Sequence, residues 1–174
     1  MPIVPETKSW TWVLDKPCPE CGFDASSVAY ASIPVIVRDN ATQWPAVLAR
    51  ADVRLRPNDH TWSPLEYAAH VRDVHRVFLA RVELMRREDD PVFTNWDQDA
   101  AAVADRYDLQ DPAAVARELT DAAGLVAAAF QAVPVAELGR TARRSDGATF
   151  TIATLARYFV HDPVHHLWDV THTV

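Results

Sequence analysis

The histidines are the residues of this chain whose spacing most clearly predicts chemistry. His161 and His165 stand four positions apart in a segment with helical periodicity, and His70 lies on the apolar face of another expected helix. Side chains at positions i and i+4 are neighbours on a helix, so two imidazoles at this spacing can point at one ion. Three imidazoles from two facing helices would hold a divalent metal with one coordination position open, as in a catalytic centre.

Residues near this pair leave the ligand set open. Pro163 lies between the two histidines and must bend the helix, because proline has no N–H for the preceding turn. His166 is therefore the rival of His165, since a rotation of the bent segment would exchange them. His172, two turns on, is more readily explained as a surface residue near the end of the chain.

The remaining histidines and nearby carboxylates have simpler explanations. Asp73 and Asp169 each lie about one turn from a candidate ligand and could orient an imidazole, although solvated carboxylates are the alternative. His60 and His75 are expected to be ordinary surface or loop residues. Histidines on helices are also common as hydrogen-bonded core residues without any metal.

Cys18 and Cys21 form a CxxC pair near the N-terminus. Two cysteines cannot build a disulfide framework, so this spacing points to a metal or to reduced thiols. A structural zinc would need two more ligands, such as His60 or His172, or a second chain. The alternative is a reduced, partly buried thiol pair, and redox chemistry of the thioredoxin kind is disfavoured because no βαβ pattern surrounds the motif.

The composition is that of a compact domain and does not favour binding to nucleic acids or insertion into membranes. The 174 residues are 49% hydrophobic and carry a net charge of −7, which repels a phosphate backbone. No apolar run approaches the roughly 20 residues that cross a bilayer, and the N-terminal residues lack the basic and apolar regions of an export signal. We therefore expect a cytoplasmic protein that binds small molecules.

Helical periodicity and helix-start signals predict an all-α four-helix bundle over residues 34–174. Ser63-Pro64-Leu65-Glu66 forms a capping box with proline in the first turn, and Asp111-Pro112 repeats the cap-then-proline signal. Pro45 should kink or split the first helix. The expected helices cover residues 34–53, 64–85, 112–133 and about 151–170. No strand is expected, and residues 139–147 are interpreted as a charged surface loop.

Two connecting regions complete the prediction. Residues 1–33 carry several prolines, two tryptophans and the CxxC pair, so they are expected to form an irregular segment that wraps onto the bundle. The connection over residues 92–110 can hold a short helix.

The motif Trp62-Ser63-Pro64-Leu65-Glu66-Tyr67-Ala68-Ala69-His70, followed by H-x-x-x-H from His161 to His165, resembles the DinB superfamily of DinB/YfiT-like metalloenzymes. The resemblance covers roughly residues 34–170. It is strongest with actinobacterial members, which include the mycothiol-dependent maleylpyruvate isomerase group.

The resemblance implies a bundle that holds a divalent metal, with zinc or nickel expected, through one residue of the second helix and two of the fourth. These map here onto His70, His161 and His165. It also implies transfer or isomerisation of a thiol adduct, with mycothiol or bacillithiol as cofactor and a small electrophile as substrate. The abundance of Ala, Val, Asp and Pro suggests GC-rich codons, which favours mycothiol. Dimers are common in the family.

Side chains near the expected ligands receive roles as hypotheses. Tyr67 and Tyr158 each lie one turn from a proposed ligand and could donate a proton to the product. Three arginines before the last helix could hold an acidic portion of the thiol cofactor, namely Arg140, Arg143 and Arg144. Two other classes stay open: a hydrolase that uses activated water at the same site, and a non-catalytic metal-binding module of the stress response.

Overall fold

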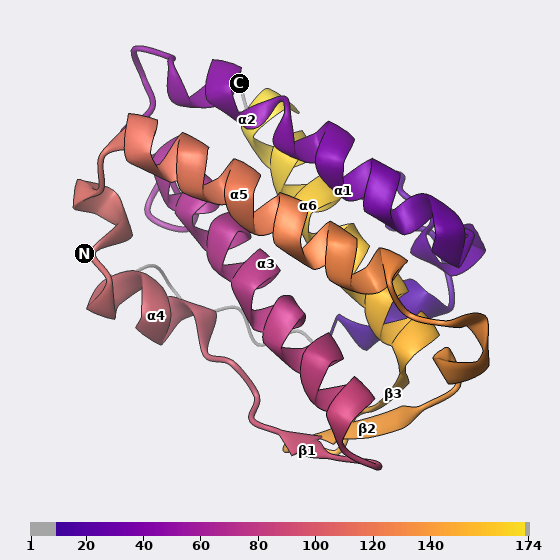
Figure 1. Ribbon diagram of the computed structural model, residues 1–174. Coiled ribbons are helices and arrows are strands. Elements are labelled where there is room, and N and C mark those ends of the chain that lie inside the picture. The colour runs from indigo at the N-terminus through magenta and orange to yellow at the C-terminus, as the bar shows by residue number, and fades with distance from the viewer. Residues whose placement is uncertain (1–9, 173–174) are drawn as a thin grey trace.

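Four long helical regions pack into a closed bundle in the computed structural model, which describes residues 10–172 (Figure 1). Helix α5 packs against α1 and α3, and α6 packs against the other sides of α3 and α1. The helices are α1 (Ile33–Ala41), α2 (Trp44–Leu48), α3 (Pro64–Arg87), α4 (Gln98–Ala104), α5 (Pro112–Gln131) and α6 (Ile152–His172). The predicted four-helix bundle is confirmed. None of the described helices is long and apolar enough to cross a membrane.

The predicted start signals act as expected. The Ser63 side chain accepts a hydrogen bond from the Glu66 backbone N–H, while the Glu66 carboxylate accepts one from the Ser63 backbone, so α3 begins with a complete capping box. Asp111 caps α5 in the same way, by accepting from the backbone N–H of Ala114. Pro45 lies in the first turn of α2, and the expected first helix is split between Ala41 and Trp44.

A small sheet at one end of the bundle corrects the expectation that the chain has no strand. It contains β1 (Val92–Phe93), β2 (Thr141–Arg144) and β3 (Thr149–Thr151), with β1 parallel and β3 antiparallel to β2. Residues 139–147, expected to be a surface loop, supply β2 and a turn in which Gly147 has a φ of +95°. Alternate residues of β2 are buried, so Ala142 and Arg144 point inward.

His75 belongs to the core, which corrects its assignment to the surface. Its side chain is fully buried and its ring packs edge-on against Phe159, which also contacts Phe78 and Phe130. Burial lowers the pKa of His75 to about 4, so the imidazole is neutral at physiological pH.

The segment before α1 lies along α6. It contains 3₁₀ turns at Thr11–Leu14, Ala25–Ser27 and Tyr30–Ser32, all in contact with that helix. Arg157 of α6 donates a hydrogen bond to the Val28 carbonyl at 2.9 Å. This packing brings the CxxC pair beside the histidines of α6.

Candidate metal centre

Four histidines of α3 and α6 belong to two clusters of potential metal ligands, and within each cluster the ligand atoms lie within 4.8 Å of one another. The first cluster, called the triad below, consists of His70, Asp162 and His166. The second, called the Cys–His cluster, consists of Cys18, Cys21, His161 and His165. The structure therefore places His70 with the rival residue His166, and it gives the predicted partners His161 and His165 to the two cysteines.

Helix geometry explains the division. Successive residues of a helix point about 100° apart, so the two i, i+4 pairs of α6 occupy adjacent faces. The pair Asp162 and His166 faces His70 on α3, whereas the preceding pair faces the N-terminal segment. Pro163 is accommodated within α6, and its carbonyl accepts a hydrogen bond from the Asn40 side chain at 2.8 Å.

The distances within the triad suit ligands of a single ion. Oδ1 of Asp162 lies 3.4 Å from Nε2 of His70 and 3.7 Å from Nε2 of His166. Nitrogen and oxygen ligands about 2.1 Å from a tetrahedral zinc are about 3.4 Å apart. Two imidazoles and one carboxylate form a donor set that suits zinc, nickel or iron and leaves coordination positions for other molecules.

Unsatisfied polar atoms give an independent test of whether a metal fits. His70 is fully buried, and neither of its ring nitrogens has a hydrogen-bond partner among the described residues. Oδ1 of Asp162 is also shielded from solvent without such a partner. Leaving buried polar atoms unpaired is costly, about 1–3 kcal/mol for each group. A shared metal ion would satisfy Nε2 of His70 and this oxygen together, so the residues fit the metal.

Neighbouring groups fix the orientation of the two imidazoles. The Trp96 ring stacks on His70 with centroids 5.4 Å apart and planes inclined by 10°, and Trp62 contacts the same imidazole at 5.2 Å. Nδ1 of His166 lies 2.9 Å from a carboxylate oxygen of Asp169, which directs the opposite nitrogen toward the triad. Asp169 thus occupies the supporting position considered for it, whereas Asp73 does not, because it binds Arg72 and Tyr107.

Electrostatics keep His70 and Asp162 in the protonation states that bind a metal. Burial lowers the pKa of His70, which favours the neutral imidazole. Burial alone would raise the pKa of Asp162, but the facing His70 and His166 hold it well below its usual range. At neutral pH the site therefore presents a neutral imidazole and a charged carboxylate.

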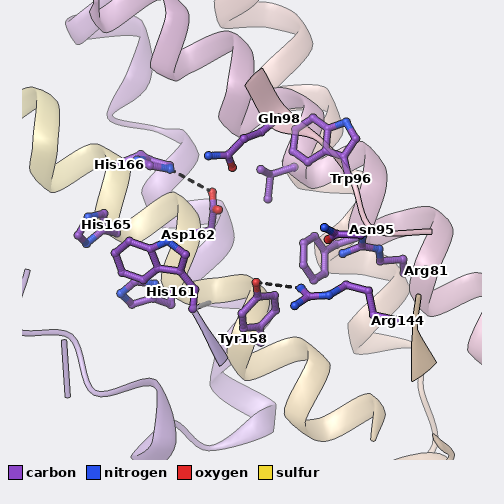
Figure 2. Close-up of a pocket in the computed structure, with 13 residues that line it drawn as sticks. Arg81, Asn95, Trp96, Gln98, Arg144, Tyr158, His161, Asp162, His165 and His166 are labelled. Carbon is purple, nitrogen blue, oxygen red and sulfur yellow. Dashed lines mark hydrogen bonds and ion pairs between the residues drawn. The ribbon is translucent and has the colours of Figure 1, made fainter. Parts of the chain in front are cut away.

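A cavity of about 110 Å³ adjoins the triad and is lined on its far side by arginines (Figure 2). Arg144 pairs with Asp146 at 2.8 Å and donates a hydrogen bond to the Tyr158 hydroxyl at 3.2 Å. Other polar groups in the wall are Asn95 and Gln98. The cavity therefore has candidate metal ligands on one side and arginines on the other.

Arg81, unlike Arg144, has no carboxylate partner among the described residues to neutralise its charge. Its guanidinium lies between the rings of Phe78 and Phe93, 4.9 and 4.7 Å from their centroids, and donates to the Thr94 carbonyl. It forms no ion pair with a carboxylate in the described part of the chain. Burial and the neighbouring charge of Arg144 lower the pKa of Arg81 to about 10, so it remains charged at neutral pH.

The other predicted site residues have different surroundings. Tyr67 contacts the His166 ring at 5.0 Å and lines a second hollow of about 310 Å³, which His166 also lines. Arg140 and Arg143 do not line the cavity; they pair with Asp89 and Asp90 beyond α3. Of the three predicted arginines, the structure brings Arg144 to the site.

Sequence reasoning missed Asp162 as a candidate ligand and Arg81 as a lining residue. The signal for Asp162 was its spacing, because D-x-x-x-H from 162 to 166 has the same helical offset as the histidine pair. Arg81 carried a weaker signal, namely a charged residue at an apolar position of a helical face. Asn95 and Trp96 lie in the irregular connection before α4, where spacing predicts no position.

Comparison with known proteins places the chain in a family. The model of the DinB superfamily matches residues 35–170. The fold is similar to that of YfiT from Bacillus subtilis, described as a probable metal-dependent hydrolase with an unusual four-helix bundle topology; the TM-score is 0.69 at 16% identity, over 98% of this chain and 92% of that one. No curated protein sequence matches the chain. Since the family model covers most of its length, the chain belongs to the DinB superfamily.

Proposed function

We propose that this protein is a metal-dependent hydrolase of small acidic molecules, with His70, Asp162 and His166 as the metal ligands. The observation that carries the proposal is that unsatisfied atoms of His70 and Asp162 converge with His166 beside a small cavity that has arginines in its wall. YfiT from Bacillus subtilis, which has a similar fold and is described as a probable metal-dependent hydrolase, supports the hydrolase class.

The charges of the cavity favour an anionic substrate. Arg144 is balanced by Asp146, whereas Arg81 contributes a positive charge without a carboxylate partner in the described residues. A divalent ion at the triad would exceed the single negative charge of Asp162. A carboxylate or phosphate group would therefore bind at the arginine side, with its scissile bond toward the triad.

The size of the cavity favours water as the second reactant. About 110 Å³ accommodates a small substrate together with a water molecule, which needs roughly 10–15 Å³ by the same measure. A divalent metal with open positions lowers the pKa of a bound water and polarises a carbonyl or phosphoryl oxygen. Arg81 would orient the acidic group, and Tyr158, whose oxygen accepts from Arg144, would donate its phenolic proton to the leaving group.

A thiol transferase or isomerase is the second candidate, and the larger hollow favours it. This hollow also reaches His166, shares Trp10 with the small cavity, and is lined in addition by Trp62 and Tyr67. A cofactor as large as mycothiol or bacillithiol exceeds the small cavity but could lie in the hollow, with its thiol at the triad and the electrophile on the arginine side.

A thiol-dependence assay separates the two candidates. The chain reconstituted with zinc or nickel is incubated with small carboxylated esters and amides and with phosphoesters, with and without mycothiol, bacillithiol or glutathione. The hydrolase proposal predicts turnover without thiol that is lost in His166→Ala and kept in His172→Ala, an exposed histidine of the same helix. Turnover that requires and consumes a thiol would favour the transferase. Metal binding without turnover of any substrate would favour a non-catalytic module.

A further inference from the structure

We propose that the Cys–His cluster is a second metal site, a structural zinc site that fastens the N-terminal segment onto α6. Its ligands would be Cys18, Cys21, His161 and His165. It shares no ligand with the triad, and its existence does not depend on the proposed hydrolase activity.

The distances within the cluster match tetrahedral zinc. Sγ of Cys18 lies 3.7 Å from Nδ1 of His165, and Sγ of Cys21 lies 3.8 Å from Nε2 of His161. With Zn–S and Zn–N distances of about 2.3 and 2.0 Å, sulfur and nitrogen ligands of a tetrahedral zinc are about 3.5 Å apart. Each thiol thus faces a different imidazole at the spacing that a shared ion requires.

The CxxC turn is folded so that both sulfur atoms reach the same place. The backbone N–H of Gly22 donates to the Cys18 carbonyl at 2.9 Å, and the N–H of Cys18 donates to the Phe23 carbonyl at 3.0 Å. Gly22 has a φ of +73°, a conformation that glycine adopts without strain. The two cysteines are not bonded to each other.

The surroundings are those of a structural site. Cys18, His161 and His165 are buried, and four protein ligands complete a tetrahedral shell without leaving a position for substrate. The Trp10 ring packs against both imidazoles, with centroids 5.5 Å from His161 and 5.2 Å from His165. His161 and His165 also line the cavity beside the triad, but a complete shell of four protein ligands has no open coordination position there.

A supporting carboxylate strengthens the assignment. Nδ1 of His165 faces the thiol, and its opposite nitrogen, Nε2, lies 3.4 Å from Glu20 and 3.6 Å from Asp169. Histidine ligands of zinc usually have such a carboxylate behind them, because it fixes the ring and increases the basicity of the ligand nitrogen. Two thiolates with two imidazoles form a donor set that selects zinc.

The site can be tested on the unaltered chain of 174 residues, purified under reducing conditions and loaded with zinc. X-ray absorption at the zinc edge should show sulfur neighbours at about 2.3 Å beside nitrogen neighbours at about 2.0 Å. Titration of the thiols with a mercurial reagent should release one equivalent of zinc for every two thiols modified. A zinc shell without sulfur, or modification of both thiols without zinc release, would overturn the proposal, as would a Cys18–Cys21 disulfide.

A matched pair of variants assigns the two sites separately. Cys21→Ser should lose the zinc equivalent of the Cys–His cluster and its sulfur neighbours. Asp162→Asn should keep that zinc and its sulfur neighbours but lose metal from the triad. Equal zinc content in Cys21→Ser and the unaltered chain would contradict the structural site. If Cys21→Ser does not fold, the absorption and mercurial experiments still decide the question. Failure of the hydrolase assay with intact sulfur coordination would reject the proposed function alone.

Discussion

His165 and His166 are adjacent in the chain, yet their rings, with centroids 5.6 Å apart and planes inclined by 75°, face different ligand clusters. Asp169 lies behind both: one carboxylate oxygen is 2.9 Å from Nδ1 of His166 and the other is 3.6 Å from Nε2 of His165. A shift of one residue along α6 therefore separates a three-ligand site beside a cavity from a four-ligand site under the N-terminal segment.

The triad predicts that Asp162→Asn weakens metal binding severely. Asparagine keeps the size of the side chain but removes the negative charge that faces His70 and His166. Since loss of a supporting carboxylate alone costs about 10–100-fold in metal affinity, loss of a ligand should cost at least as much. Competition with a chelator measures the affinity, and His172→Ala is the control. A triad affinity in Asp162→Asn within about twofold of the unaltered chain would reject the ligand assignment.

Arg81 predicts selectivity for acidic substrates. Arg81→Met keeps an apolar side chain between Phe78 and Phe93 but removes the guanidinium. A charge-assisted hydrogen bond contributes about 1.5–3 kcal/mol, so KM for an anionic substrate should rise about 10–100-fold. The KM of a neutral analogue should stay nearly constant. Equal changes for the two substrates would show that Arg81 is structural.

His75 predicts a loss of stability in mildly acidic solution. The unfolded chain protonates this imidazole near pH 6.5, whereas burial delays protonation of the folded chain to a pKa of about 4. The contribution of neutral His75 to the free energy of unfolding is therefore fully present above pH 6.5. It decreases by about 3 kcal/mol as the pH falls to 4. Urea unfolding at a series of pH values measures the effect.

The variant His75→Leu separates this contribution. Both ring nitrogens lack hydrogen-bond partners in the described structure, so leucine should raise the free energy of unfolding by about 1 kcal/mol at pH 7. The gain should grow between pH 6.5 and 4, because leucine does not titrate. A variant less stable than the unaltered chain at pH 5 would contradict the neutral, unpaired state of His75.

The buried Asp73 should cause a second loss of folding stability at a more acidic pH than that from His75. Burial raises the pKa of its carboxyl group, but hydrogen bonds from Arg72 and from the Tyr107 hydroxyl at 2.6 Å lower this pKa by a larger amount. The folded pKa lies below the ordinary 3.8, so this stabilisation is present above pH 3.8 and disappears as the pH falls through the folded pKa. Asp73→Asn should destabilise the chain by about 3 kcal/mol at pH 7 and by less in acid.

Glu118 provides the matched control for Asp73. It also pairs with Arg72, at 2.9 Å, but its side chain is 46% exposed. Exposed ion pairs contribute about 0–1 kcal/mol, so Glu118→Gln should have a small effect in the same unfolding assay. Similar losses for Glu118→Gln and Asp73→Asn would show that burial of the Asp73 pair adds nothing.

The sequence predicts the helices well because their signals are local. The capping box at Ser63, the cap at Asp111 and the split at Pro45 each depend on a few adjacent residues, and all three are confirmed. The short strand with Arg144 was missed because a few alternating polar residues resemble a loop. His75 lies four residues after Val71 and three before Phe78, two buried positions of one helical face, so periodicity could have placed it in the core.

The pairing of ligands was harder to predict because it depends on packing between distant segments. Helical spacing shows that residues four apart share a face, but it does not show which of two adjacent faces of α6 meets α3. That rotation is set by the contacts of α6 with α3, with α1 and with the N-terminal segment. The CxxC motif was likewise visible, while its histidine neighbours lie more than a hundred residues away in the chain.

Anomalous X-ray diffraction from crystals of the metal-loaded protein, collected on both sides of the metal's absorption edge, tests the central claim most directly. We expect an anomalous peak within about 2.2 Å of Nε2 of His70, Oδ1 of Asp162 and Nε2 of His166. A metal ion bound instead by His70 together with His161 and His165, or loaded crystals with no peak at the triad, would contradict the account.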